Sequence, residues 1–363
     1  MAVYELKPTK QPPLSERGAI AWIRHNLLSS PFNILFTILS LWILYIIIPP
    51  MVKWFVLDAN FVGNSKAECT GDGACWIFIR EKFKIFIYGF YPESEQWRAN
   101  LTMGLGALTV ALAVIDRVPR SIKIASILML PVVAIILLSG GYFGLAYIET
   151  NQWGGLLLTL VIAAVGIVLS FPIGILFALG RQSKLPIIKT LSVFYIELIR
   201  GVPLITVLFM ASVVLPLFFP EGMDFDKLIR ALIGITLFQA AYVAENIRGG
   251  LQAIPRGQYE ASEAMGLTYW KRMRLVILPQ AIKVAIPNLV GSFISLFKDT
   301  SLVMIIGLFD LLSMVTLTTN DRDWLGLSTE GFVFVAIIYW IFNYLMSRYS
   351  KNLEKKLDTN NKD

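Results

Sequence analysis

The sequence predicts an all-α integral membrane protein with about eight transmembrane helices, and this prediction rests on composition and hydropathy. Hydrophobic residues make up 56% of the 363 residues and charged residues only 16%, against roughly 25% charged residues in soluble domains. The mean hydropathy is +0.65. Several runs without charge reach the length of about 20 apolar residues that a helix needs to cross the hydrocarbon core of a bilayer.

The eight expected spans follow one another along the whole chain. Six are free of charge, and they cover residues 31–52, 99–115, 124–148, 150–180, 201–220 and 331–347. Two carry charged side chains: the span at about 228–247 contains Glu245, and the span at about 281–306 contains Lys298 and Asp299. The first run starts after residue 30 and no small-residue cleavage site follows it, so we expect a retained anchor and not a signal peptide.

The distribution of Lys and Arg predicts that both termini face the cytoplasm. Segments on the N-terminal side of the membrane hold 22 of the 32 basic residues, whereas segments on the opposite side hold nine. Cytoplasmic loops of membrane proteins carry such an excess. Basic loops beside anionic headgroups also account for the net charge of +7, so this charge requires no nucleic-acid partner.

The long outside loop at residues 51–98 contains the two cysteines of the chain, Cys69 and Cys75. In an oxidising compartment a pair this close could form a disulfide, and Gly71 and Gly73 between them would let the ends meet. The alternative is two unpaired thiols in a turn. The loop also mixes aromatic and basic residues, which favours an ordinary folded segment at the membrane interface, with a contact surface for an outside partner as the alternative.

A polar, positively charged stretch at residues 259–279 separates two strongly apolar regions. A membrane-embedded chain with such a stretch is expected to contact something in the cytoplasm with it. Its distinctive residues are Glu260, Ala261, Ser262, Gly266, Leu278 and Pro279.

The same stretch predicts a helix–turn–helix knob. Pro255 fits the first turn of a helix, and residues 256–265 favour a helix because they are rich in Glu and Ala. Gly266 would break that helix and permit a left-handed turn. A second amphipathic segment at 268–278 would then be ended by Pro279. The alternative is a loop that merely connects two spans.

The spacing of Glu260-Ala261, Gly266 and Leu278-Pro279 resembles the EAA loop of ABC importer permeases, with Ser and Val where that pattern usually has Ala and Ile. Three further stretches resemble segments of permeases of the polar amino-acid family, and they cover residues 194–204, 242–258 and 294–302. The first half of the chain, with GACWIFIREKF and GFYPESEQWR in its outside loop, looks like the eight-span general L-amino-acid permeases within that family.

This resemblance implies a type I ABC importer permease core with three extra N-terminal helices. The expected parts are a cytoplasmic tail at 1–31, a three-helix extension at 32–148 with the periplasmic loop 51–98, a five-helix core at 149–348 with the coupling loop 249–280, and a cytoplasmic tail at 349–363.

The resemblance also implies a multi-pass subunit of the bacterial inner membrane that imports L-amino acids with broad specificity and is not an enzyme. Its implied partners are two ABC ATPase subunits, a related second permease subunit, a periplasmic amino-acid-binding protein and membrane lipid. In this family the coupling loop docks into a groove on the ATPase. ATP and Mg would therefore lie on that partner, and this chain would bind no cofactor.

Charges inside a membrane are costly, so they are treated as functional by default. We expect Lys298 and Asp299 to lie beside the substrate path, where Asp299 with Thr300 and Ser301 could end one helix and begin another. The alternative is a structural ion pair between Lys298 and a neighbouring helix, with Glu197 or Glu245 as its partner. These two glutamates are also candidates for the path.

Residues that are absent narrow the remaining functions. The one histidine, His25, allows no His-based metal site or catalytic triad, so we expect no metal site. No Walker A sequence occurs, so the chain would need a separate ATPase. An ion-coupled secondary transporter, with Lys298, Asp299 and Glu245 as a relay, is the second interpretation, and the coupling loop argues against it. A membrane enzyme lacks support from any nucleophile or carboxylate pair.

Overall fold

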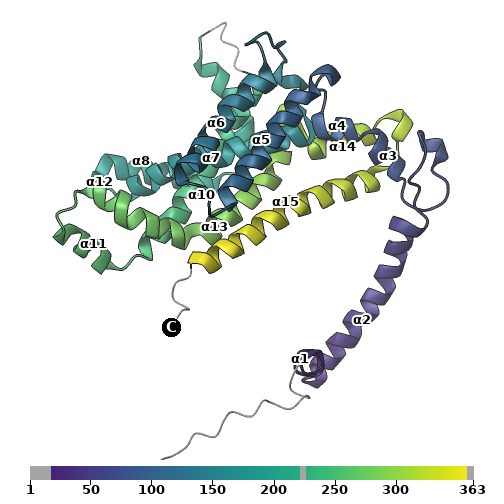
Figure 1. The fold of residues 1–363 in the computed structure, drawn as a ribbon, viewed down its shortest axis with the longest axis horizontal. Coiled ribbons are helices and arrows are strands. Elements are labelled where there is room, and N and C mark those ends of the chain that lie inside the picture. The colour runs from purple at the N-terminus through teal and green to yellow at the C-terminus, as the bar shows by residue number, and fades with distance from the viewer. Residues whose placement is uncertain (1–17, 221–225, 358–363) are drawn as a thin grey trace, which may run out of the picture. The chain divides into compact units, whose positions relative to one another are not determined.

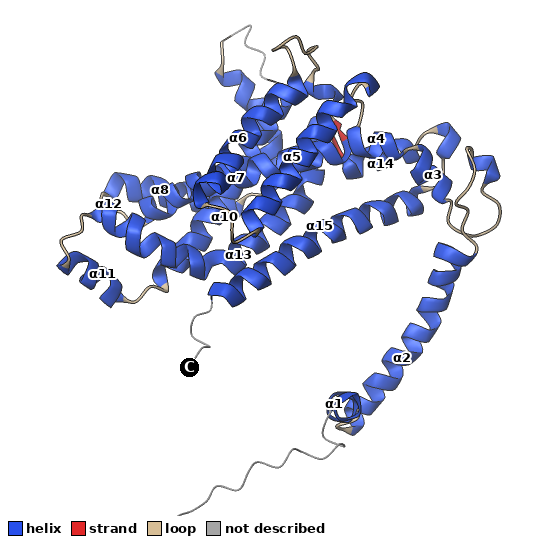
Figure 2. Ribbon diagram, viewed as in Figure 1, coloured by secondary structure: helices blue, strands red, loops and turns tan. Residues whose placement is uncertain are grey.

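The computed structural model describes residues 18–220 and 226–357, which form long helices and one two-residue strand (Figure 1, Figure 2). The chain divides into two compact units, Met1–Ile77 and Phe78–Asp363. Among the described residues seven helices are long and apolar enough to cross a membrane, and the number rises to eight if the bent pair Pro186–Gly201 and Leu204–Phe218 is counted as one span. The predicted all-α membrane fold with about eight spans is confirmed. The expected tails at 1–31 and 349–363 lie partly outside the described residues.

One long apolar helix dominates the first unit. α1 (Gly18–Asn26) precedes α2 (Pro31–Val52), and a π-helical turn (Lys53–Leu57) extends α2 to a span of 27 residues. Ser30 caps the start of the helix, because its hydroxyl accepts a hydrogen bond from a backbone N–H of the first turn at 3.2 Å. Pro31 fits the first helical position, where its missing N–H costs no hydrogen bond. Within the first unit no side chain of α2 is buried.

The segment that follows α2 folds back on itself. A disulfide joins Cys69 to Cys75, and Cys75 also pairs with Asn60 in an isolated β-bridge. The indole Nε1 of Trp76 donates to the Phe55 carbonyl at 2.9 Å, and the two ring centres lie 4.8 Å apart. This part of the outside loop is therefore an ordered structure closed by covalent and aromatic contacts.

The second unit contains the remaining extension helices and the core. The extension helices are α3 (Trp76–Glu81), which begins at the end of the first unit, α4 (Phe83–Tyr88), α5 (Gln96–Val114) and α6 (Arg120–Ser139). The core comprises α7 (Gly155–Arg181), α8 (Pro186–Gly201), α9 (Leu204–Phe209), α10 (Lys227–Gln252), α11 (Arg256–Ala264), α12 (Tyr269–Arg272), α13 (Leu278–Asp299), β1 (Phe309–Asp310), α14 (Leu311–Thr319) and α15 (Ser328–Leu357).

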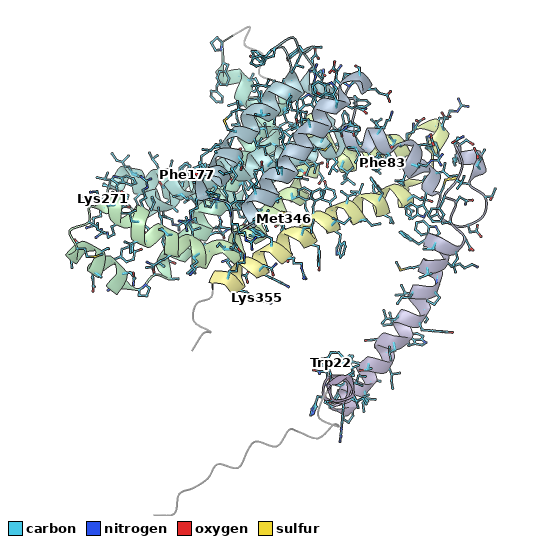
Figure 3. All side chains as sticks on the ribbon, viewed as in Figure 1. Trp22, Phe83, Phe177, Lys271, Met346 and Lys355 are labelled. Carbon is cyan, nitrogen blue, oxygen red and sulfur yellow. A yellow bond between two sulfur atoms is a disulfide. The ribbon has the colours of Figure 1, made fainter. Side chains whose placement is uncertain are left out.

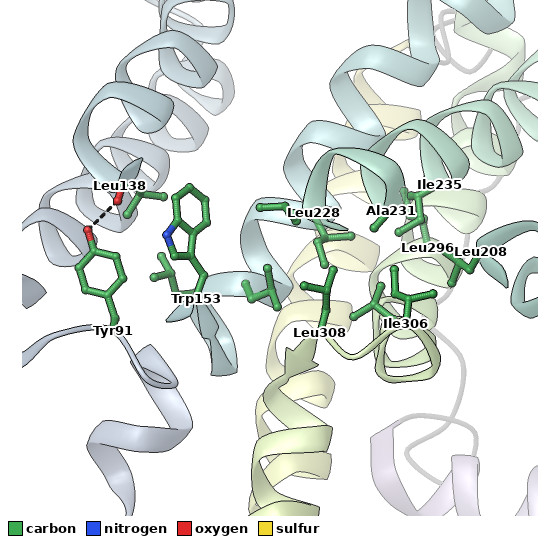
Figure 4. Packing of buried hydrophobic residues seen from close by; sticks show 14 of the residues in the cluster. Tyr91, Leu138, Trp153, Leu208, Leu228, Ala231, Ile235, Leu296, Ile306 and Leu308 are labelled. Atoms are coloured by element: carbon green, nitrogen blue, oxygen red, sulfur yellow. Dashed lines mark hydrogen bonds between the residues drawn. The ribbon is translucent and has the colours of Figure 1, made fainter. Parts of the chain in front are cut away.

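Glycines set the closest helix contacts of the core. A Cβ on Gly174 of α7 would lie 2.5 Å from a methyl carbon of Val243 in α10, and a Cβ on Gly250 of α10 would lie 2.2 Å from the Ala281 carbonyl oxygen in α13. Small residues allow such close approach in membrane helix pairs. Figure 4 shows part of one buried cluster of the second unit, with labelled side chains from α9, α10 and α13 among its members.

The predicted span at 124–148 is wrong at both ends. α6 begins at Arg120 and ends at Ser139. The helix stops there because Gly140 and Gly141 take φ values of 66° and 78°, in the left-handed region that glycine enters without penalty. The apolar residues from 142 to 148 belong to a turn, and α7 begins only at Gly155. Hydropathy detects the apolar run, but it does not detect the left-handed backbone conformation of the two glycines that ends the helix.

A buried arginine holds this turn against α5. The side chain of Arg98 is almost fully buried, its Nη1 donates to the Ala146 carbonyl at 2.8 Å, and its Nε lies 2.8 Å from a Glu95 carboxylate oxygen. Nearby, the Tyr91 hydroxyl donates to the Leu138 carbonyl at 2.9 Å, and burial raises the pKa of Tyr91 to about 12. These polar contacts fix the end of the α5–α6 pair at which α5 begins and α6 ends.

Replacing Arg98 by Leu is expected to lower the free energy of unfolding by about 3 kcal/mol, because Glu95 and the Ala146 carbonyl lose their buried partner. Thermal denaturation of the purified protein in detergent measures the effect. Lys84→Leu is the matched control, since its pair with Glu93 at 3.2 Å is exposed on both sides and should contribute less than about 1 kcal/mol. Equal losses in both variants would contradict a structural role for Arg98.

Candidate functional sites: the coupling loop and the groove between α10 and α13

The first half of the coupling loop forms as the sequence predicts. α10 ends at Gln252, Pro255 precedes the next helix, and α11 runs over Arg256–Ala264. Gly266 then takes a φ of 72°, and its N–H donates to the Glu263 carbonyl at 2.9 Å. The left-handed residue closes the helix end and turns the chain.

The second half differs from the prediction, because Pro279 does not end a helix. α12 passes into a π-helical turn (Met273–Ile277) and then directly into α13, so that Tyr269–Ile306 is one continuous span. Pro279 lies in the first turn of α13. A proline there follows the wider π turn, whose hydrogen bonds skip five residues, so its missing N–H and its ring are accommodated.

The loop is anchored on one side and exposed on the other. Ser262 is buried, and its hydroxyl donates to the Tyr259 carbonyl at 2.8 Å. Burial also raises the pKa of Tyr259. Arg272 lies 2.9 Å from Glu263 and ties α12 to α11. Lys271 lies at the tip of this end of the second unit (Figure 3).

The exposed side of the loop presents both charged and apolar side chains. Met265, Trp270 and Leu275 are each about two-thirds exposed, at 69%, 66% and 65%. Of the residues that the sequence singles out, Glu260, Ala261, Gly266 and Pro279 are exposed, Leu278 is half-buried, and Ser262 is buried. A surface of this kind at the end of two long helices can dock against another protein.

A cluster of charged side chains lies where α7, α8 and α10 meet. Glu245 is its centre: Arg248 donates to both carboxylate oxygens, at 2.8 and 2.6 Å. Arg181 and Arg200 lie 3.5 and 3.7 Å from the same carboxylate, and Arg181 also pairs with Glu197 at 2.8 Å. The two glutamates thus neutralise arginines, and neither is paired with Lys298 in the described part of the chain.

A groove of about 530 Å³ lies between α10 and α13. Its lining is Phe238, Gln239, Tyr242, Asn246, Pro287, Asn288, Gly291, Ser292, Ser295 and Asp299. Asp299 is therefore at the groove, whereas Lys298, Glu245 and Glu197 are outside its lining. α13 ends at Asp299, and a 3-10 helix (Thr300–Ile306) follows, so the helix does change at the predicted place.

Sequence reasoning missed the polar residues that α10 contributes to this groove. Gln239 is 3% exposed and its Nε2 has no hydrogen-bond partner in the described residues. Asn246 donates to the Ser292 hydroxyl at 2.7 Å. A buried amide without a partner is costly, so Gln239 is suited to bind a ligand. Two amide side chains inside the span at 228–247 were the available signal.

Comparisons with known proteins agree with this architecture. Residues 170–359 match the family described as the binding-protein-dependent transport system inner membrane component. The chain is 56% identical to the inner membrane amino-acid ABC transporter permease protein YhdY of Escherichia coli, over 94% of both chains. It is 40% identical to the glutamate/glutamine/aspartate/asparagine transport system permease protein BztC of Rhodobacter capsulatus, over 97% of both.

A shorter relative covers only part of the chain. The probable glutamine ABC transporter permease protein GlnP of Bacillus subtilis is 34% identical over 56% of this chain and 91% of its own length. The chain belongs to the family of binding-protein-dependent transport system inner membrane components, and it is a multi-pass permease subunit of an ABC importer. Membership implies ATPase and binding-protein partners.

Gly266→Ala is expected to weaken retention of the ATPase about tenfold, because an alanine at a φ of 72° strains the turn by roughly 1–2 kcal/mol. Co-purification of the ATPase in mild detergent measures it. Gly257→Ala is the matched control: a Cβ at either glycine would meet nothing within 4 Å, but Gly257 lies inside α11 without a positive φ. If both variants retain the ATPase like the wild type, the loop geometry does not serve docking.

Proposed function

We propose that this permease carries L-amino acids of broad specificity across the bacterial inner membrane, in a complex driven by ATP. Two ATPase subunits would bind the ATP and Mg, a periplasmic binding protein would deliver the amino acid, and a related second permease would complete the path. Both termini would face the cytoplasm. The relatives named as amino-acid permeases and the polar groove support this proposal.

The groove between α10 and α13 is the observation on which the substrate path rests. Its one charged lining residue is Asp299, beside uncharged amide and hydroxyl groups. A carboxylate suits the α-ammonium group that all L-amino acids share, and the free amide of Gln239 can donate to their carboxylate. Contacts with the shared backbone groups would accept many side chains, which is what broad specificity requires.

The same two helices connect the groove to the coupling loop. Three residues separate the end of α10 from α11 of the coupling loop, and α13 continues from α12 of that loop without a break. Movement of the loop by a closing ATPase dimer would therefore move both walls of the groove. This gives a direct mechanical route from ATP binding to a change in access.

The expected organisation also stays part of this proposal. The extension at 32–148 with loop 51–98 would add to a core at 149–348 that contains the coupling loop 249–280. The relative that matches 56% of this chain over 91% of its own length supports a core that can occur without the extension.

ATP dependence separates this proposal from an ion-coupled carrier. Uptake of labelled amino acids into proteoliposomes with the full complex should stop when ATP is withdrawn and should persist when the proton gradient is collapsed. The opposite pattern would favour the carrier. The structure weakens a relay of Lys298, Asp299 and Glu245, because Glu245 is held by arginines.

Asp299→Asn is expected to raise the apparent KM for neutral amino acids by at least tenfold, because a charge-assisted hydrogen bond contributes about 1.5–3 kcal/mol. Gln239→Leu should act in the same direction with a smaller effect. Asp321→Asn is the control, since Asp321 pairs with Lys82 at 3.2 Å outside the groove. Uptake kinetics in proteoliposomes measure all three. A KM unchanged by both groove substitutions would remove the groove from the substrate path.

A further inference from the structure

α8 differs from the spanning helices because the chain bends by 108° between it and the segment Leu204–Phe218. Its residues lie between the expected spans at 150–180 and 201–220, and they form a helix of 16 residues. Figure 1 shows α8 at the same end of the second unit as α11 and α12. The ion pairs of Arg200 and Glu197 in α8 with the cluster around Glu245 place it near the end of α10 that leads to the coupling loop.

One face of α8 is fixed on the core. Ser192 and Ile196 are buried, and the ring of Tyr195 stacks on Phe177 of α7 with centres 4.0 Å apart. The Tyr195 hydroxyl also donates to the Leu237 carbonyl of α10. These contacts hold one face of α8 against α7 and α10, so the helix cannot turn its other faces inward.

A second face of α8 is apolar and exposed. Ile187, Leu191, Phe194 and Leu198 are 73%, 62%, 63% and 50% exposed. Their spacing of four, three and four residues places them in one stripe along the helix. These side chains are large, whereas contacts between membrane helices favour small ones. The stripe therefore suits lipid chains better than a second helix.

The remaining charge of α8 complements a lipid surface. Lys184 just before the helix and Lys189 within it are exposed, and neither forms an ion pair among the described residues. Lys189 follows Ile187 by two residues and therefore lies on the side of α8 away from the stripe. A basic residue opposite a stripe of Ile, Leu and Phe is typical of helices that lie in the plane of a membrane. Anionic headgroups attract such lysines, each with an effect of about 1 kcal/mol.

We propose that α8 is an in-plane membrane helix whose apolar stripe inserts among the acyl chains of the leaflet on the coupling-loop side. Lys184 and Lys189 bind anionic phospholipid headgroups of that leaflet. The ion pair of Arg200 in α8 with Glu245 in α10 then links the lipid surface to the helix that enters the coupling loop. This inference does not depend on which substrate is transported.

Site-directed spin labelling tests the position of the stripe in the full complex, reconstituted in lipid nanodiscs. The two native cysteines form a disulfide, so within this chain a nitroxide attaches only to a new cysteine in Leu191→Cys, Phe194→Cys or Lys189→Cys, and the chain is labelled before the complex is assembled. At 191 and 194 the label should collide more often with lipid-soluble oxygen than with a water-soluble nickel chelate, and at 189 the order should reverse. ATPase activity of each labelled complex checks that it is folded.

Two outcomes overturn the proposal. Frequent collision with the nickel chelate at both 191 and 194 would place the stripe in water. Protection from both reagents would place it against protein, with the second permease as the occupant. Two stripe positions are used so that failure of one variant to fold still leaves a result.

Lipid preference tests the two lysines separately. Spin-labelled phosphatidylglycerol should associate with the complex more strongly than spin-labelled phosphatidylcholine. The preference should fall about fivefold for each lysine replaced in Lys184→Gln and Lys189→Gln. Lys184→Arg and Lys189→Arg keep the charge and should keep the preference. An unchanged preference in the Gln variants would show that these lysines do not bind the headgroups.

Discussion

The close contact of α10 with α7 on one side and α13 on the other is the constraint on which the rest of the second unit depends. Val243 approaches α7 only because Gly174 has no side chain, and Ala281 approaches α10 only because Gly250 has none. Inside a bilayer the hydrophobic effect does not drive helices together, because lipid chains are as apolar as the helix surfaces. Helix association must therefore come from such close packing. These two contacts determine where the groove and the coupling loop lie.

Polar groups inside this packed unit divide into those with partners and those without. Glu245 is surrounded by Arg181, Arg200 and Arg248. Its charge is therefore neutralised by ion pairs that hold helices together. Gln239 lies one to two turns away on the same helix, and its Nε2 has no hydrogen-bond partner among the described residues. A buried polar group without a partner costs free energy, and such a cost is retained only where another contact or a function offsets it. We therefore assign the unpaired amide nitrogen of Gln239 to ligand binding in the groove, and the paired carboxylate of Glu245 to holding the helices together.

The sequence predicts the spans well because each is long and apolar, and it predicts the turn at Gly266 because only glycine takes that backbone freely. Prediction from the sequence fails where a local pattern is compatible with two structures. Pro279 looks like a helix end, but it falls in a first turn after a π turn. Gly140 and Gly141 end a helix inside an apolar run. The groove needs α10 and α13 side by side, and no local pattern contains that pairing.

α10 is connected both to the coupling loop and to α8, and these two connections explain how one helix could serve coupling. At its end it leads into the coupling loop, and near that end it is ion-paired to α8. If α8 stays at the membrane surface, a pull on the loop moves α10 against a fixed point and not together with the whole subunit. Displacement is then concentrated in the walls of the groove. A helix free of such an anchor would transmit the same pull as a rigid shift of the subunit, with no change in access.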